Sequence, residues 1–402
     1  MVKKILIVSS DYTGYGHKSI TTALCEQFSK YPDVSVHVID GFSLGGNITL
    51  RIGKMYGSVT RNAKELWRLM WDISLKRPDL LNEMTEFMIK DAFLKILKSI
   101  QPDLIISVHP NFNGSLLNIL KEYKIDIPFV TLIADLVSIT PLWTDPRADY
   151  ILCPTTESKY SAIEFGVAEA KTKIIGFPIR SRFCIQATEE VQQKDNRYTL
   201  DRPLECLIMS GGEGSGNMST VAKILLKNFN CKIKIISGKN HVLKRRLENT
   251  LLEKYSDRVQ IFGFVDDIQD LMASSDIAFT RGSPNTALEA VMCNVPLIIT
   301  GALPGQEEGN PGYLQKKNLA VVCKDVRKLK GVITELLSDD AKKLNVIKNS
   351  QREFRNPNVS KEIVDFLLGI DGRGEFTIPD SPKKFFKLRT PKQLSLRRHR
   401  RY

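Results

Sequence analysis

Short runs of hydrophobic residues alternate with segments of helical periodicity along most of the chain. In the first half these runs occupy residues 3–10, 34–40, 103–110, 127–135, 149–154 and 173–178. They are rich in β-branched residues, and each is followed by a glycine or polar turn and then by a helical pattern. Buried parallel strands connected by helices have this pattern. The first half is therefore predicted to form βαβ units around a parallel sheet.

The same succession of patterns starts again after residue 203. In this second half the hydrophobic runs occupy residues 204–212, 231–238, 258–264, 275–282, 295–300 and 319–323. Residues 183–203, between the halves, are polar and show no periodicity, so the domain boundary is predicted there. We expect an α/β protein with two Rossmann-like parallel-sheet domains, which face each other across a cleft at the carboxyl ends of their strands.

These patterns divide the chain into five predicted parts. They are an N-terminal domain, a linker, a C-terminal domain, a further helix and a basic tail, over residues 1–180, 181–200, 201–350, 351–370 and 371–402. In the tail ten Lys and Arg stand against three Asp and Glu, and there is little periodicity. Such a segment is typical of a mobile tail, or of one that becomes ordered on binding.

Composition and charge limit the classes of function. The 402 residues are 42% hydrophobic and 26% charged, which is typical of a globular protein. A net charge of +13, from 58 Lys and Arg against 45 Asp and Glu, indicates an anionic partner: nucleic acid, an acidic membrane surface or a phosphorylated substrate. No hydrophobic stretch reaches the ~18 residues of a spanning helix, and the seven cysteines are scattered. We therefore expect an intracellular protein without a disulfide framework or a zinc site.

The first candidate site directly follows the first hydrophobic run, where Gly14, Gly16 and His17 open a predicted helix. Glycines allow a tight turn and a close approach of a ligand to the backbone, and a helix N-terminus favours a negative group. The full GxGxxG fingerprint is missing, which argues against a nicotinamide site. A histidine at this position suits a general base near neutral pH, but a helix-capping or exposed histidine would fit the spacing equally well.

A glycine-rich turn over residues 210–217 follows the first strand of the second half. Its glycines leave several backbone N–H groups free for phosphate oxygens: Gly211, Gly212, Gly214 and Gly216. It is not a Walker loop, because no Lys-Ser or Lys-Thr pair follows the glycines. The turn is predicted to contact a phosphate or a nucleotide, and a merely flexible turn is the alternative.

A second candidate anion site lies between the run at 275–282 and the helical sequence ALEAVM. It combines Arg281 with the small polar residues Ser283, Asn285 and Thr286. Glu289, one turn into the helix, is placed to accept hydrogen bonds from two ribose hydroxyls. A glutamate near a helix start also fits a partner of the helix dipole, and the spacing alone does not separate the two roles.

The loop after the run at 295–300 is rich in amide and carboxylate groups. Gln306, Glu307 and Asn310 can bind the hydroxyls of a polyol through bidentate hydrogen bonds, although a solvated loop has the same composition. No His, Cys or Asp cluster has the spacing of a metal site, and no GxSxG motif occurs. We therefore expect neither a metal centre nor serine-hydrolase chemistry.

Residues 44–78 combine basic and hydrophobic side chains. Seven Lys and Arg stand against Glu65 and Asp72, a net charge of +5. Five apolar residues are predicted to share one helical face: Leu66, Trp67, Met70, Trp71 and Ile73. Interfacial helices combine aromatic and basic residues in this way. The segment is a candidate membrane-binding helix, and a core helix packed on the sheet is the alternative.

Taken in order, the motifs GYGH, GFPIR, SGGEGSG, IFGFV, TRGSPNTxxEA and PGQEEGN resemble those of one family. It is the lipid glycosyltransferases that include plant monogalactosyldiacylglycerol synthases and bacterial processive diacylglycerol β-glucosyltransferases. The peptidoglycan lipid-intermediate N-acetylglucosaminyltransferase is a more distant relative. The resemblance covers residues 1–345. It departs from the family pattern at Arg281, where lysine is usual, and at Ser283 and Asn285, where glycines are common.

The resemblance implies a GT-B fold, with the acceptor and the membrane bound by the N-terminal domain and a UDP-sugar by the C-terminal domain. It implies that His17 is the base on the acceptor hydroxyl and that the glycine-rich turn lies at the diphosphate. The residues it assigns to the donor, from the diphosphate through uracil and ribose to the hexose, are Arg281, Phe264, Val265, Glu289, Gln306, Glu307 and Asn310. Enzymes of this family invert the anomeric centre and use no metal or other cofactor.

We therefore expect an inverting transferase that moves galactose or glucose from UDP-galactose or UDP-glucose to diacylglycerol, forming a β-glycolipid. Gly14, Gly16, Trp67 and Trp71 are the predicted contacts with the acceptor or the membrane. Most of the excess charge lies in the tail (+7) and in residues 44–78 (+5), outside the nucleotide motifs. This distribution suits an anionic membrane better than a nucleic acid. The expected location is cytoplasmic, peripheral on the inner face of the cell membrane.

Three alternatives stay open. The acceptor is another lipid-linked sugar in the first. The second is a basic nucleic-acid-binding protein, which predicts a recognition helix or RNA-stacking aromatics that the sequence does not display. The third, a nucleotide-sugar epimerase, shares the architecture but needs acid and base groups on both faces of one sugar carbon, and the motifs supply no such pair.

Overall fold

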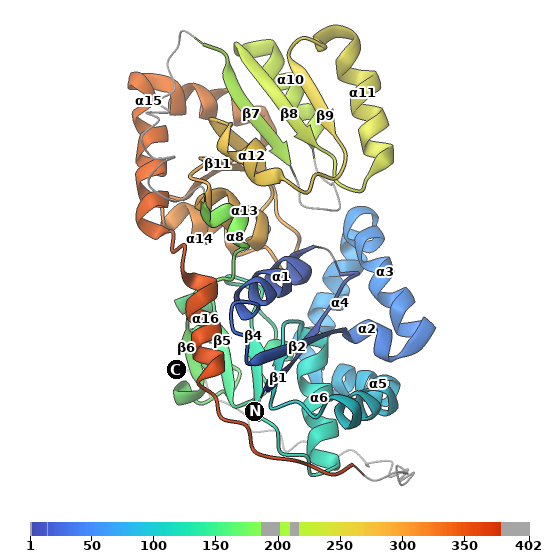
Figure 1. Ribbon diagram of the computed structural model, residues 1–402. Helices are drawn as coiled ribbons and strands as arrows, with labels where there is room; N and C mark the ends of the chain where they lie inside the picture. Colours follow the sequence, from blue (N-terminus) through green and yellow to red (C-terminus); the bar gives the residue numbers. More distant parts are fainter. Residues whose placement is uncertain (1, 14, 186–201, 210–216, 379–402) are drawn as a thin grey trace, which may run out of the picture.

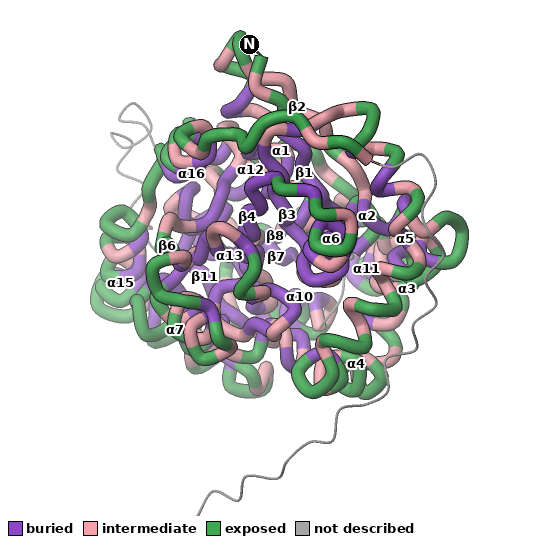
Figure 2. The backbone as a smooth tube through the Cα atoms, turned by 90° about the horizontal axis from the view of Figure 1, so that it is seen from below, coloured by how far each residue is buried: buried purple, intermediate pink, exposed green. Residues whose placement is uncertain are grey.

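The computed structural model describes residues 2–13, 15–185, 202–209 and 217–378. These residues form two lobes, each built on a six-stranded sheet in which all neighbouring strands are parallel (Figure 1). Viewed from below, the central strands occupy the buried interior, whereas β2 lies near the rim (Figure 2). The predicted fold class, two parallel-sheet α/β halves, is confirmed.

The first sheet has the strand order β2-β1-β3-β4-β5-β6. Its strands are β1 (Lys3–Ser9), β2 (Val34–Asp40), β3 (Leu104–Ser107), β4 (Phe129–Leu132), β5 (Tyr150–Cys153) and β6 (Thr172–Ile174). Each lies on a predicted hydrophobic run, with β6 starting one residue earlier. Every residue of β3 and β4 is buried, as expected for central strands that are covered on both faces.

The second sheet has the order β12-β11-β10-β7-β8-β9. Its strands are β7 (Leu204–Met209), β8 (Cys231–Ile236), β9 (Val259–Phe262), β10 (Ile277–Thr280), β11 (Leu297–Ile299) and β12 (Ala320–Val322). All six lie within the hydrophobic runs of the second half.

Helices cover both sheets. Those of the first lobe are α1 (Gly16–Phe28), α2 (Gly41–Leu44), α3 (Gly46–Asn62), α4 (Lys64–Lys76), α5 (Pro78–Ile100), α6 (Pro110–Glu122), α7 (Thr156–Glu164) and α8 (Ser181–Ile185), with the 3₁₀ helices η1 (Pro141–Trp143) and η2 (Glu169–Lys171). The later helices are α10 (Met218–Asn228), α11 (His241–Tyr255), α12 (Ile268–Ala273), α13 (Pro284–Met292), α14 (Asn310–Lys316), η3 (Val326–Lys328), α15 (Leu329–Phe354) and α16 (Val359–Leu368).

In each sheet the strand order reverses beside the first strand. Strand β1 has β2 on one side and β3 on the other, and β7 has β8 on one side and β10 on the other. At such a switch point the loops that follow the two strands leave toward opposite faces, and a crevice opens at their carboxyl ends. The described parts of the predicted motifs after β1 and β10 lie at the two switch points, and residues 210–216 after β7 are outside the described residues.

The segment 44–78 forms α3 and α4, and α4 turns its two tryptophans inward. The ring of Trp67 contacts Tyr56 edge-on at 5.2 Å between centroids, and Trp71 lies against Gly305 of the second lobe. Leu66 and Met70 instead are 48% and 44% exposed. The predicted shared face is therefore split into two neighbouring stripes of the helix, one packed and one exposed. In the described part of the chain, no helix is long and apolar enough to cross a membrane.

Helix α16 follows the second lobe in sequence but packs on the first (Figure 1). Its Ser360 hydroxyl accepts a hydrogen bond from the N–H of Ile179 (2.9 Å) and donates one to the Ile179 carbonyl (2.8 Å). Phe366 contacts the ring of Tyr150 edge-on. Residues 186–201 and 379–402 lie outside the described residues, with most of the predicted linker and tail, so the domain boundaries stay a prediction.

We predict that Ser360→Ala destabilises the first lobe by about 1–3 kcal/mol, because it leaves both backbone groups of buried Ile179 without this partner. The three tryptophans all belong to this lobe, so urea unfolding followed by their fluorescence reports on it. Ser99→Ala, on the exposed side of α5, is the control and should change the free energy of unfolding by less than about 0.5 kcal/mol. Equal effects of the two substitutions would contradict the prediction.

Candidate active site

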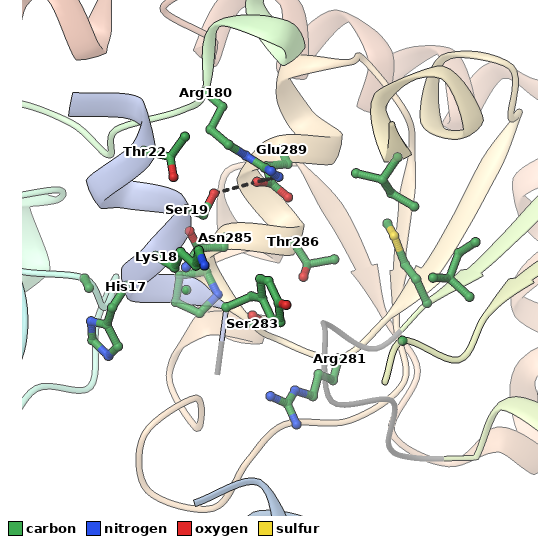
Figure 3. A pocket seen from close by; sticks show the side chains of 18 of the residues that line it. His17, Lys18, Ser19, Thr22, Arg180, Arg281, Ser283, Asn285, Thr286 and Glu289 are labelled. Atoms are coloured by element: carbon green, nitrogen blue, oxygen red, sulfur yellow. Dashed lines mark hydrogen bonds and ion pairs between the residues drawn. The ribbon is translucent and has the colours of Figure 1, made fainter. Parts of the chain in front are cut away.

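A pocket lies between the two lobes, and the loops that line it leave the carboxyl ends of both sheets (Figure 3). From the first lobe its walls include Tyr15, Gly16, His17, Lys18, Ser19, Asp135 and Arg180. From the second they include Phe264, Val265, Arg281, Ser283, Asn285, Thr286, Glu289, Gln306 and Glu307. The two switch points thus contribute to one pocket.

His17 lies in the first turn of α1 and is buried. Its Nδ1 is 2.6 Å from the carbonyl oxygen of Val108. A carbonyl only accepts hydrogen bonds, so Nδ1 must carry the proton, and Nε2 has the free lone pair. Burial lowers the pKa of His17 to about 4, against a smaller opposing effect of the Val108 carbonyl. At neutral pH the ring is neutral, in the tautomer that a general base requires.

The ring of a second histidine, His109, packs against that of His17 at a tilt of 51°, with 4.5 Å between ring centroids. It caps α6: its Nδ1 accepts from the backbone N–H of Asn111 at 3.3 Å, so Nε2 carries the proton and donates to Thr13 Oγ1 at 3.1 Å. Burial, with the proximity of His17, holds the pKa of His109 well below its usual value. Two neutral rings therefore stand at the carboxyl ends of neighbouring strands β1 and β3.

The N-terminus of α13 approaches the N-terminus of α1 across the pocket. A Cβ atom on Gly16 would lie 2.7 Å from Nδ2 of Asn285, so the two helix starts approach each other closely at this glycine. Ser283, the N-cap of α13, makes no side-chain capping bond, and the first-turn N–H groups of a helix have no intrahelical partner. Arg281 lies just before this turn. The arrangement suits an anionic ligand.

Glu289 is buried and connects the lobes. Its Oε1 accepts from Nη2 of Arg180 at 2.7 Å and from Oγ of Ser19 at 3.0 Å, and both partners belong to the first lobe (Figure 3). The carboxylate is thus charge-compensated from across the pocket. Since both hydrogen bonds go to Oε1, Oε2 is the oxygen left for further hydrogen bonds.

Aromatic rings form another wall of the pocket. The ring of Tyr15, from the first lobe, lies 4.7 Å from that of Phe264, and the Lys239 ammonium is 4.6 Å from the Tyr15 centroid. Phe264 is 42% exposed. Flat exposed rings of this kind are suited to a planar base.

The loop after β11 brings two polar side chains to the pocket. Glu307 is buried; its Oε1 is 3.2 Å from Nε of Arg281, and its Oε2 accepts from the N–H of Leu303. Gln306 reaches the first lobe, where its Nε2 lies 3.3 and 3.4 Å from the carboxylate oxygens of Asp135. Burial above all raises the pKa of Asp135 to about 7, and the charge of Glu307 acts in the same direction.

Comparisons with known proteins identify the family of the chain. A family model described as monogalactosyldiacylglycerol (MGDG) synthase matches residues 17–179, and one described as glycosyl transferases group 1 matches residues 218–339. A processive diacylglycerol beta-glucosyltransferase of Bacillus mycoides is 28% identical over 368 residues, which cover 91% of this chain and 93% of the relative. A probable monogalactosyldiacylglycerol synthase 2 of Oryza sativa subsp. japonica is 30% identical over 342 residues, covering 81% of this chain and 71% of the relative. The chain belongs to the monogalactosyldiacylglycerol synthase family.

Solved structures of other proteins resemble this family member in their fold. MurG of Acinetobacter baumannii superposes with a TM-score of 0.59 at 14% identity, over 92% of this chain and 100% of that chain. UDP-GlcNAc 2-epimerase of Neisseria meningitidis gives 0.60 at 13% identity, over 91% and 99%. At such identities the match concerns the fold alone. These structures confirm the predicted GT-B fold, and the family models and the relatives confirm the family resemblance and the glycosyltransferase class.

The structure brings most of the predicted site residues of this glycosyltransferase into one pocket, and their individual roles stay predictions. Asn310 is the exception in the hexose loop: it is buried at the start of α14, and its Nδ2 donates to the Gly282 carbonyl at 2.9 Å. Trp67 and Trp71 pack beside the pocket without lining it. The predicted glycines outside the described residues are Gly14, Gly211, Gly212, Gly214 and Gly216.

Sequence reasoning missed four polar residues of the family member's pocket and its surroundings: Ser19, His109, Asp135 and Arg180. Two of them lie near the ends of predicted hydrophobic runs, His109 shortly after β3 and Asp135 shortly after β4. Their positions at strand ends next to the switch point were the available signal. Arg180 belongs to the motif GFPIR, but its partner, Glu289, lies 109 residues away.

We predict that His17 stays neutral, with the proton on Nδ1, until the pH falls to about 4. Nitrogen-15 NMR of the imidazole should follow this titration, with a histidine-containing peptide, pKa about 6.5, as the reference. Because the folded pKa lies below the unfolded one, this group lowers stability as the pH falls from about 6.5 to about 4. A His17 resonance that titrates with the reference peptide would contradict the prediction.

Proposed function

We propose that this enzyme is an inverting glycosyltransferase that moves galactose or glucose from a UDP-sugar to the hydroxyl of diacylglycerol. The observation that carries the proposal is the position of His17: a neutral, buried base in the first lobe shares a pocket with the helix N-terminus and arginine of the second lobe. The processive diacylglycerol beta-glucosyltransferase that matches over 91% of the chain supports the lipid acceptor.

The reaction needs one proton transfer. In the proposed mechanism Nε2 of His17 takes the proton from the acceptor hydroxyl as that oxygen attacks the anomeric carbon. The Val108 carbonyl oxygen, 2.6 Å from Nδ1, accepts the hydrogen bond of the Nδ1 proton and stabilises the imidazolium as it forms. The oxygen attacks from the side opposite to the departing UDP, so an α-linked donor gives a β-glycoside.

The leaving diphosphate needs positive charge and hydrogen-bond donors. We assign this task to Arg281 and the first-turn N–H groups of α13, together with the predicted glycine-rich turn. Arg281 lines the pocket and forms an ion pair with Glu307, with 3.2 Å between Nε and Oε1, so its positive charge lies where an anion in the pocket would bind. Glu289 would bind the ribose, and the rings of Phe264 and Tyr15 would lie at the uracil.

The direct test is incubation with labelled UDP-galactose or UDP-glucose and diacylglycerol. We expect glycolipid from at least one donor, and His17→Ala should lose about 10²–10⁴-fold of the turnover, because general base catalysis contributes that much. His37→Ala, on β2 and outside the pocket, is the matched control and should retain activity. UDP affinity, measured by calorimetry, should be unchanged in both variants.

The outcomes separate the competing functions. Glycolipid from neither donor would refute the proposed function, whereas product only with a lipid-linked sugar would move the acceptor to that class. A fully active His17→Ala variant would remove the base from the mechanism and leave the reaction class intact.

The acceptor is a membrane lipid, and one surface of the first lobe suits a bilayer. Eleven large apolar side chains are exposed on three consecutive helices, α3, α4 and α5: Ile48, Ile52, Met55, Leu66, Leu69, Met70, Ile73, Leu75, Leu80, Met84 and Phe87. Exposed basic residues accompany them: Arg51, Lys54, Arg68, Lys76 and Arg77. Apolar side chains that enter the headgroups, ringed by cations that meet anionic lipids, are typical of peripheral membrane proteins.

This surface borders the pocket. Tyr56 of α3 lies 3.5 Å from Oε1 of Gln306, and Trp71 of α4 contacts Gly305 in the same loop. We infer that α3–α5 rest on the bilayer, so that an acceptor hydroxyl at the headgroup level can reach His17 while its acyl chains stay in the membrane.

We predict that Leu66→Asp with Met70→Asp weakens binding to vesicles containing anionic phospholipid at least tenfold. Each substitution removes about 1.5–3 kcal/mol of the free energy gained by transferring an apolar side chain from water into the membrane, and each new carboxylate is repelled by the anionic lipid. Val346→Asp, which replaces an equally exposed (48%) apolar residue on α15, is the control and should bind like the wild type. Vesicle flotation measures the effect. Equal loss in all variants, or no loss in the double variant, would exclude this surface.

A further inference from the structure

Asp135 is a buried carboxyl group whose role neither the sequence motifs nor the proposed mechanism explains. It follows β4 and lines the pocket on the acceptor side, with 1% of its surface exposed. Its two oxygens lie 3.3 and 3.4 Å from Nε2 of Gln306, which comes from the other lobe. It also accepts a hydrogen bond from the side chain of Trp143, whose ring lies 6.1 Å from that of His17.

Titratable side chains from three elements lie around Asp135. The loop after β11 contributes Glu307, whose negative charge opposes ionisation of Asp135 and is itself paired with Arg281. His17 of α1 is neutral, and the ring of Trp143 lies between its neighbourhood and Asp135: it is 6.1 Å from the His17 ring and hydrogen-bonds to Asp135. Tyr56 of α3 lies at the far end of the Gln306 amide, 3.5 Å from its Oε1.

We propose that Asp135 is a positioning residue for donor specificity: as a carboxylate it fixes the orientation of the Gln306 amide and so decides which hydrogen-bonding groups meet the hexose. The inference rests on the proposed function, because it concerns the hexose end of that donor site. The family resemblance assigns the donor-binding residues to the second lobe, whereas this inference places a residue that controls donor specificity in the first lobe.

The reason is the polarity of the two groups. A carboxylate only accepts hydrogen bonds, so Nε2 of Gln306 must face it, and Oε1 must face away. Protonated Asp135 also donates, and either orientation of the amide then finds a partner. Galactose and glucose differ in the direction of one hydroxyl, so an amide of fixed polarity distinguishes them better than one that rotates.

Because Asp135 ionises, the orientation of the Gln306 amide should depend on pH in a defined direction. The pKa of Asp135 is raised to about 7, so the carboxylate and the fixed amide prevail above pH 7, and both are lost as the pH falls below it. Discrimination between the two donors should therefore be greatest at pH 8 and decline toward pH 6.

The test is the binding of UDP-galactose, UDP-glucose and UDP by calorimetry between pH 6 and 8, with Asp135→Asn, Gln306→Ala and the double variant. We expect each single substitution to bring the ratio of the two UDP-hexose dissociation constants about three- to tenfold closer to one at pH 8, the effect of one lost hydrogen bond. The double variant should be no worse than Gln306→Ala alone, since Asp135 acts through Gln306. Affinity for UDP, which lacks the hexose, should change less than twofold, and the pH dependence of the ratio should vanish in Asp135→Asn.

Additive effects of the two substitutions, or a ratio that Asp135→Asn leaves unchanged, would overturn the inference. A merely structural role would lower the thermal midpoint and weaken UDP as much as the UDP-hexoses, with the ratio retaining its pH dependence. Asp33→Asn, which changes an exposed aspartate directly before β2, is the matched control and should behave as the wild type. Because binding needs no acceptor, these outcomes are distinct from a failure of glycolipid formation, which would count against the proposed function alone.

Discussion

Three buried carboxyl groups, Asp135, Glu289 and Glu307, lie around one pocket, and the site depends on how their charges are compensated. A buried carboxylate costs several kcal/mol unless it is paired and hydrogen-bonded. Glu289 and Glu307 meet this cost with arginines, at 2.7 and 3.2 Å. Asp135 accepts hydrogen bonds from neutral groups instead, and its pKa rises to about 7. The three groups are therefore tuned differently by their partners.

The two arginine pairs also differ in what they connect. Arg281 and Glu307 belong to the same lobe, and a bound diphosphate can draw on the arginine without moving one lobe against the other. Arg180 and Glu289 belong to opposite lobes. A ribose bound to Glu289, as proposed, would enter a hydrogen-bonded group that already includes Ser19 and Arg180, and donor binding would then be coupled physically to the contact between the lobes.

The sheets could be predicted from the sequence because a parallel strand covered on both faces is a continuous hydrophobic run, and twelve such runs are present. Arg281, Glu289 and His17 were found because a glycine or a helix start next to a strand end marks them. Arg180 and Asp135 could not be assigned, since their partners lie 109 and 171 residues away and only the folded chain brings them together. For the same reason Trp67 and Leu66 were predicted to share one helical face. Helical periodicity does not reveal which stripe of a helix a neighbouring element covers.

The low pKa of His17 has to be reconciled with the role of a base. Its main cause is burial, because a buried imidazolium would lose its hydration, and the hydrogen bond to the Val108 carbonyl offsets only part of that loss. In the proposed reaction a UDP-sugar would bring negative charge to the same pocket, and an opposite charge nearby raises the pKa of a histidine. The alcohol proton, in turn, becomes acidic only as its oxygen bonds to the anomeric carbon. Burial thus keeps the ring neutral and its Nε2 lone pair free beforehand, and the donor supplies the electrostatic field in which proton transfer becomes favourable.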